Sequence, residues 1–161
     1  MTHVLHEIKD INQKLDSITF SDDNESNYML IVKLEDGTRY TYSLIRRKLC
    51  CETIGFFMPK TQFVDEALRV TKTVSKTRVI TRSNELTGHV LNKLVINVND
   101  LDEDMMYNEG RMATMELIFA NGEIFEFGYY NKHNGFYPHH LYLKLYEKLD
   151  VDGMLVFKST I

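Results

Sequence analysis

The segment "YYNKHNGFYPHH", residues 129–140, concentrates side chains that can bind a ligand. Tyrosine rings offer rigid contact area and can stack on a nucleobase. Asn134-Gly135 and Pro138 are turn residues, so the same segment can be a hairpin connection whose aromatic side chains pack on a sheet. As a recognition loop, it would use Tyr129, Tyr130, His133, Asn134, Phe136, Tyr137 and His139.

A zinc site built from His133, His139 and His140 is disfavoured. His139 and His140 are adjacent, so on a strand they point to opposite faces, and no cysteine lies nearby in sequence. We therefore expect no metal site.

Cys50 and Cys51 are adjacent. Adjacent cysteines rarely form a disulfide with each other, because the small ring that the disulfide closes strains the peptide bond between them. Glu52, or a histidine brought close by folding, could act as a base for a thiol nucleophile. However, there is no glycine-flanked nucleophile turn, no nucleotide-binding glycine loop and no zinc-protease motif. The sequence predicts no catalytic residue and no cofactor, and a Cys-dependent enzyme is kept as an alternative.

A basic stretch covers residues 69–82 and contains no acidic residue. Threonines and valines between the cations favour extended structure. The stretch is either the solvated face of a strand or a phosphate-binding surface. The cations concerned are Arg69, Lys72, Lys76, Arg78 and Arg82.

Composition points to one soluble globular domain over residues 1–161. Hydrophobic residues make up 43 % and charged residues 26 % of the chain, and the net charge is −4. That charge is too mild for a DNA mimic and too acidic for a general nucleic-acid binder. We found neither an apolar run long enough for a membrane span nor a signal peptide, so we expect a cytoplasmic protein.

The hydrophobic pattern predicts an α+β fold: a curved, largely antiparallel sheet with a short N-terminal helix. Apolar residues between Val4 and Leu15 recur at helical spacing. Asp36-Gly37 and Asn121-Gly122 each predict a hairpin turn. These turns divide the chain into a first hairpin half (15–60), a basic connection (61–90) and a second hairpin half (90–161). Their similarity is compatible with a duplication.

Two stretches resemble one family. "GTRYTYSLIRRKLCCE", residues 37–52, and "FEFGYYNKHNGFYPHHLYL", residues 125–143, resemble an uncharacterised phage and prophage domain family of unknown function. That family carries Cys-Cys-Glu and His-Asn-Gly-Tyr-Tyr motifs, and Phe136 stands here where the family has a tyrosine. The resemblance implies a phage-type origin, and then the host cytoplasm, but no known reaction.

The leading functional prediction is therefore a non-catalytic accessory protein that binds and inhibits a host defence protein, in the manner of an anti-CRISPR. The alternative is a sponge that sequesters a nucleotide immune signal, with cations 69–82 on its phosphates and tyrosines on its base. Such sites often form at an oligomer interface, so a homodimer is left open.

Overall fold

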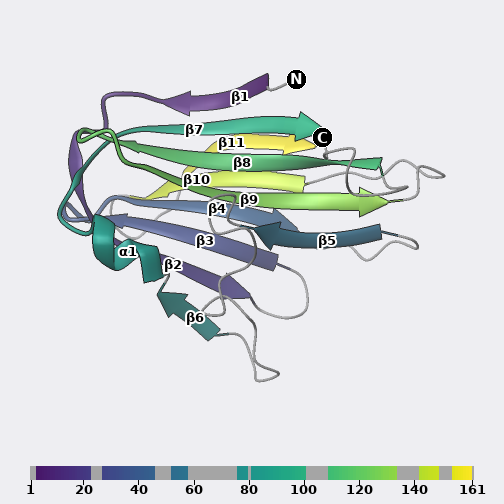
Figure 1. Ribbon diagram of the computed structural model, residues 1–161, viewed down its shortest axis with the longest axis horizontal. Coiled ribbons are helices and arrows are strands. Elements are labelled where there is room, and N and C mark those ends of the chain that lie inside the picture. Colours follow the sequence, from purple (N-terminus) through teal and green to yellow (C-terminus); the bar gives the residue numbers. More distant parts are fainter. Residues whose placement is uncertain are drawn as a thin grey trace.

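The computed structural model describes residues 3–22, 27–45, 52–57, 76–79, 81–100, 109–133, 142–148 and 154–160. Within these ranges, eleven strands form one antiparallel hydrogen-bonded sheet (Figure 1). The strands are β1 (His3–Ile8), β2 (Gln13–Asp22), β3 (Asn27–Leu34), β4 (Arg39–Ile45), β5 (Glu52–Phe57), β6 (Lys76–Val79), β7 (Val90–Asp100), β8 (Glu109–Phe119), β9 (Ile124–His133), β10 (Tyr142–Lys148) and β11 (Met154–Thr160).

The predicted α+β class is wrong, because the described residues form an almost entirely β structure. Their one helix is α1 (Thr81–Leu86), a single short element before β7. No helix in the described part of the chain is long and apolar enough to cross a membrane.

The N-terminal helix is also wrong: this segment forms β1 and the start of β2. Asp10 and Asn12 have φ angles of 56° and 51°, and they bend the chain between the two strands. Asp and Asn tolerate this left-handed conformation better than other non-glycine residues. The bend, and not a helical turn, brings Ile8, Ile11 and Leu15 to the core. The five apolar residues between Val4 and Leu15 are spaced in a way that fits a helix as well as two strands joined by a bend. Only the pairing with β7 distinguishes these interpretations.

The sheet folds over so that two layers pack face to face. Layer A contains β1, β7, β8, β9 and β5, and layer B contains β6, β2, β3, β4, β10 and β11. The layers join where β2 pairs with β7 through Gln13–Leu91 and Lys14–Val90. Alternate residues of each strand point into the space between the layers, as the two-residue period of a strand requires. A hydrophobic core fills this space.

Two similar units make up most of the fold, and they exchange strands. β2, β3 and β4 are consecutive neighbours in layer B, as are β7, β8 and β9 in layer A. β5 follows β4 in sequence but pairs with β9, whereas β10 follows β9 but pairs with β4. Likewise β1 pairs with β7, and β6 pairs with β2. Each unit therefore supplies its first and last strands to the other layer.

The two hairpin turns are confirmed and have the same hydrogen-bond pattern. Gly37 and Gly122 have φ angles of 92° and 89°, the conformation that glycine adopts without strain. In each turn the aspartate or asparagine before the glycine accepts a hydrogen bond from the backbone N–H two residues ahead. These bonds are Thr38 N to Asp36 Oδ1 (2.8 Å) and Glu123 N to Asn121 Oδ1 (2.9 Å).

The units also match in their irregularities. The β2–β3 register shifts between Leu15 and Ser17, and the β7–β8 register shifts between Leu91 and Lys93. Buried positions correspond along the paired strands that follow. The matched pairs are Leu15/Leu91, Ile18/Leu94, Phe20/Ile96, Leu30/Met115, Val32/Leu117, Leu34/Phe119, Tyr40/Phe125, Tyr42/Phe127 and Leu44/Tyr129. This correspondence favours the duplication that the sequence left open.

Candidate functional site

Tyr129, the first residue of the predicted recognition loop, belongs to the core. Its exposed fraction is 0 %, and its ring packs edge-on against Phe127 at 5.2 Å. Its hydroxyl donates a hydrogen bond to the Tyr42 carbonyl, 2.7 Å away in the opposite layer. Burial raises the pKa of Tyr129 well above its ordinary value. The ring is therefore committed to packing and is not open to a stacking ligand.

Tyr130 points to the other face of β9, as the alternation of a strand requires. It lies opposite Gly55 of β5, and a Cβ atom added at Gly55 would lie 2.5 Å from the Tyr130 hydroxyl oxygen. The ring thus covers the glycine of the neighbouring strand, an arrangement that stabilises glycine-containing edge strands. Partial burial raises the pKa of Tyr130. Its place in the fold is that of a packing residue.

Most of the remaining predicted site residues lie outside the described part. These are Asn134, Phe136, Tyr137, His139, Arg69 and Lys72, together with Cys50 and Cys51. His133 ends β9, Glu52 begins β5, and Lys76, Arg78 and Arg82 lie on β6 and α1. Only the backbone of these five is described. β6 itself agrees with the predicted extended structure of the basic stretch and pairs with β2.

The described side chains do bring together a different basic surface, on the outer face of layer B. An open groove of about 580 Å³ lies across β3, β4 and β10. This volume falls within the range of roughly 300–1,000 Å³ that is usual for small-molecule sites. Arg39 and Lys144 line it together with Tyr146 and the hydroxyl residues Thr41 and Ser43. We call this surface the basic groove.

Strand pairing places cations beside cations on this face. Lys33 of β3 lies directly opposite Arg39 of β4, and Lys144 of β10 lies directly opposite Lys158 of β11. Like charges at directly opposite positions destabilise a sheet. Asp16 approaches Lys33 at 3.9 Å, but both side chains are about half exposed, so this ion pair contributes little.

Tyr146 and its neighbours separate the two cationic rows. Tyr146 pairs with Thr41, and Thr41 pairs with Ile31, so an aromatic, a hydroxyl and an aliphatic side chain form the row between the cations. Among the described outward-facing residues of β3, β4 and β10, there is no acidic side chain. The groove therefore offers positive charge, hydrogen-bond donors and one aromatic face.

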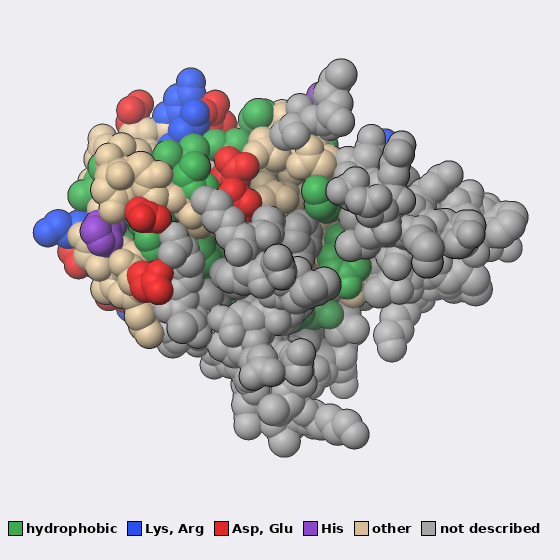
Figure 2. All heavy atoms as spheres, viewed as in Figure 1, with side chains coloured by type: hydrophobic (Ala, Val, Ile, Leu, Met, Phe, Trp, Pro, Cys, Tyr) green, Lys and Arg blue, Asp and Glu red, His purple; other side chains and the backbone are tan. Residues whose placement is uncertain are grey.

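The outer face of layer A carries both signs of charge. Glu116 of β8 lies directly opposite Glu126 of β9, and Glu7 of β1 lies in the same row beyond Val95, where Lys93 pairs with it. Acidic and basic side chains also both appear on the part of the surface that is coloured in Figure 2. The single sign of the basic groove is thus a local feature in a chain whose net charge is −4.

The sequence analysis missed this surface because its residues are scattered along the chain. Arg39 and Lys144 come from strands that become neighbours only through the exchange of β10. The available signal was the alternation in β3 and β4, which places Lys33 and Arg39 outward beside their shared turn. Nothing in the sequence indicated that Lys144 would join them.

Metal binding finds no support in the described residues, where no group of three histidine, cysteine, aspartate or glutamate side chains could hold an ion. Comparison of the chain with protein-family models, with curated proteins and with solved structures finds no match. The resemblance to the Cys-Cys-Glu and His-Asn-Gly-Tyr-Tyr family therefore stays a prediction.

Proposed function

We propose that the protein is a binding protein that holds a nucleotide, free or within a single strand, in the basic groove. One observation carries the proposal: cations occupy directly opposite positions on neighbouring strands of the outer face of layer B, with Tyr146 between the two cationic rows. An anionic ligand would relieve the repulsion between these cations, so the face is better suited to a complex than to free solvent.

The chemistry of the groove matches the parts of a nucleotide. Arg39 offers a planar fork of donors that binds phosphate in a bidentate manner, and Lys144 offers a point charge. Thr41 and Ser43 can donate hydrogen bonds to phosphate or sugar oxygens. Tyr146 is half-buried, so its ring is held in place while one face can stack on a base.

A fluorescence anisotropy titration would test the proposal. The probes are a labelled nucleoside triphosphate, a labelled cyclic dinucleotide and a labelled single-stranded oligonucleotide. Arg39→Glu and Lys144→Glu reverse a charge inside the groove, and Lys14→Glu makes the same change at an exposed position on the β2–β7 corner. We expect both groove variants to weaken binding at least tenfold and Lys14→Glu to have little effect.

Equal loss of binding in Lys14→Glu would show that only the overall charge matters and would contradict a site in the groove. Absence of binding for all three probes at low salt would reject the proposal outright. Low salt is the appropriate condition because screening weakens interactions between exposed charges.

Two other functions stay predictions. Inhibition of a host defence protein depends on the family resemblance, and a Cys-dependent enzyme depends on Cys50 and Cys51, which lie outside the described residues. The nucleotide sponge of the sequence analysis is the alternative that the basic groove supports, although with other residues than the stretch 69–82.

A further inference from the structure

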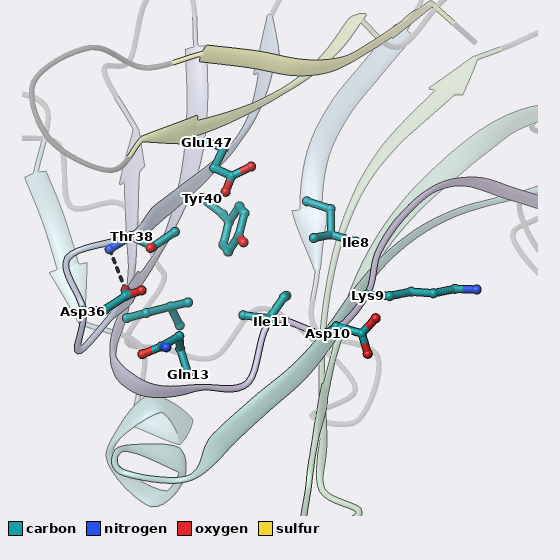
Figure 3. A pocket seen from close by; sticks show the side chains of 10 residues that line it. Ile8, Lys9, Asp10, Ile11, Gln13, Asp36, Thr38, Tyr40 and Glu147 are labelled. Atoms are coloured by element: carbon teal, nitrogen blue, oxygen red, sulfur yellow. Dashed lines mark hydrogen bonds between the residues drawn. The ribbon is translucent and has the colours of Figure 1, made fainter.

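A second and chemically opposite pocket lies on the inner side of the strands that carry the basic groove. It has a volume of about 270 Å³ and opens between the β1–β2 bend, the β3–β4 turn and the end of β10 (Figure 3). Tyr40 and Arg39 are consecutive residues of β4, so they point to opposite faces of the strand. The pocket is therefore separate from the groove and does not depend on the proposed function.

Tyr40 is the central polar residue of this pocket. Its exposed fraction is 4 %, and its hydroxyl points into the pocket toward Ile8 and Ile11 (Figure 3). No hydrogen bond joins this hydroxyl to another of the described residues. The side chain is buried, but its hydroxyl borders the open volume of the pocket and is therefore available to a bound polar group.

Carboxylates from three separate elements line the pocket. Glu147 and Asp36 lie on the side of Tyr40, whereas the carboxylate of Asp10 points away from it (Figure 3). Asp36 is held in place because one of its oxygens accepts the Thr38 N–H at 2.8 Å. Burial, and then the charges of Glu147 and Asp36, raise the pKa of Tyr40 to about 12, so the field of both carboxylates reaches the hydroxyl.

Lys9 also lines the pocket but does not neutralise it. Its ammonium group lies 3.9 Å from a Glu7 carboxylate oxygen, and its side chain extends away from Tyr40 (Figure 3). The Lys9 side chain is exposed, and its ion pair with Glu7 lies at the surface. The polar wall around Tyr40 therefore presents acceptors and negative charge.

The rest of the lining is aliphatic on one side and holds the uncharged polar residues Gln13 and Thr38 on the other. Ile8, Ile11 and Leu34 form the wall next to the Tyr40 ring. A metal ion would not use this wall, and no three carboxylates among the described residues converge closely enough to hold one. The volume is also below the range of roughly 300–1,000 Å³ that accommodates drug-sized ligands. The pocket suits a small, linear group with one charged end.

We propose that this pocket binds an alkylammonium group, with the Tyr40 hydroxyl and the Glu147 and Asp36 carboxylates accepting its N–H donors. The alkyl chain contacts Ile8, Ile11 and Leu34. An ammonium group has three donors and no acceptor, which matches the acceptors that the Tyr40 hydroxyl and the two carboxylates offer. Two sources share this chemistry: a free diamine or polyamine, and the lysine side chain of a protein partner.

The test is an NMR titration of the full chain, followed through the methyl signals of Ile8 and Ile11. The probes are pentane-1,5-diamine, Nα-acetyl-lysine amide and the neutral analogue pentan-1-ol. We expect saturable shifts of both methyl groups with at least one of the two amines and none with the alcohol. Saturation by the diamine alone assigns a free amine, and saturation by the lysine amide assigns a protein side chain.

Three variants complete the test. Glu147→Gln and Tyr40→Phe should each weaken amine binding about tenfold, because the first removes a negative charge and the second removes an acceptor for a charged donor. Glu35→Gln removes a carboxylate from the same hairpin outside the pocket and should leave binding unchanged. Glu147→Gln keeps the test decisive if Tyr40→Phe fails to fold. Equal shifts with pentan-1-ol, or no shift with either amine, would overturn the proposal.

Discussion

The hydroxyl of Tyr129 donates a hydrogen bond to the backbone carbonyl of Tyr42, 2.7 Å away across the two layers. Tyr42 in turn donates its hydroxyl to the Ala113 carbonyl at 3.0 Å, and the two rings lie 4.8 Å apart. Both side chains are fully buried. Each unit of the fold therefore supplies one tyrosine that fixes the position of one layer on the other.

Removal of the Tyr129 hydroxyl tests this link. We expect Tyr129→Phe to lower the free energy of unfolding by about 1 kcal/mol, the usual net contribution of such a hydrogen bond. Urea denaturation measures the change. Tyr146→Phe removes a hydroxyl from the outer face of layer B and should cost less than about 0.5 kcal/mol. Equal costs for the two variants would show that the buried bond does not stabilise the packing of the layers.

Alkaline pH should unfold the protein through its buried tyrosines. Burial raises the pKa of Tyr40 from 10.0 to about 12, and it also raises the pKa values of Tyr42 and Tyr129. The folded state therefore holds these protons more tightly than the unfolded state. By linkage, the stabilisation is fully present below pH 10, the ordinary value, and is lost as the pH rises through 10 and toward 12.

Parallel measurement of tyrosinate absorbance and circular dichroism checks this expectation. The buried tyrosines should ionise together with the loss of β structure, and Tyr40→Phe should make stability fall less steeply above pH 10. Ionisation of all tyrosines while the circular dichroism is unchanged would contradict the burial of these side chains.

Gly55 should tolerate no side chain while Tyr130 is present. A Cβ atom at this position would lie 2.5 Å from the Tyr130 hydroxyl oxygen and 2.6 Å from Cζ. We expect Gly55→Ala to cost about 1–3 kcal/mol because the ring must move. In a Tyr130→Ala background the same change should cost markedly less. A double-mutant cycle measures this coupling, and strictly additive costs would refute it.

The two glycine turns should respond alike to substitution. Gly37→Ala and Gly122→Ala each force a Cβ atom into a left-handed conformation, at φ angles of 92° and 89°. We expect each to cost about 1–2 kcal/mol in thermal or urea denaturation. No atom lies within 4 Å of a Cβ atom built at Gly122, so its cost should come from the backbone alone. A cost in only one turn would argue against their equivalence.

Binding in the basic groove should depend on salt through the groove cations. If a single-stranded oligonucleotide binds there, the logarithm of the association constant should fall linearly with the logarithm of the salt concentration. The slope should be about −0.7 for each phosphate contacted. Arg39→Ala or Lys144→Ala should each reduce this slope by roughly one contact. Anisotropy titrations at several salt concentrations give the slopes. An unchanged slope in both variants would place the phosphates elsewhere.

Local sequence signals predicted the parts of the fold that depend on neighbouring residues. Asp36-Gly37 and Asn121-Gly122 predicted their turns because few residues adopt the required backbone conformation. The N-terminal helix failed because its apolar residues reach the core through a bend at Asp10 and Asn12.

The candidate sites show the limit of such reasoning. Tyr129 and Tyr130 looked alike in sequence, but one packs between the layers and the other covers Gly55. Which of them faces inward depends on the register of β9 against its partners, and a shift of one residue would exchange them.

The sequence by itself determined the two glycine turns and the similarity of the two hairpin halves, because these follow from the backbone preferences of single residues and from local patterns. Only the tertiary structure decided that the units exchange β5 and β10. That exchange places Lys144 beside Arg39's strand and Glu147 beside Tyr40, and so creates both the basic groove and the acidic pocket. Pairing between strands about a hundred residues apart depends on the free energy of the whole core, which no local pattern contains.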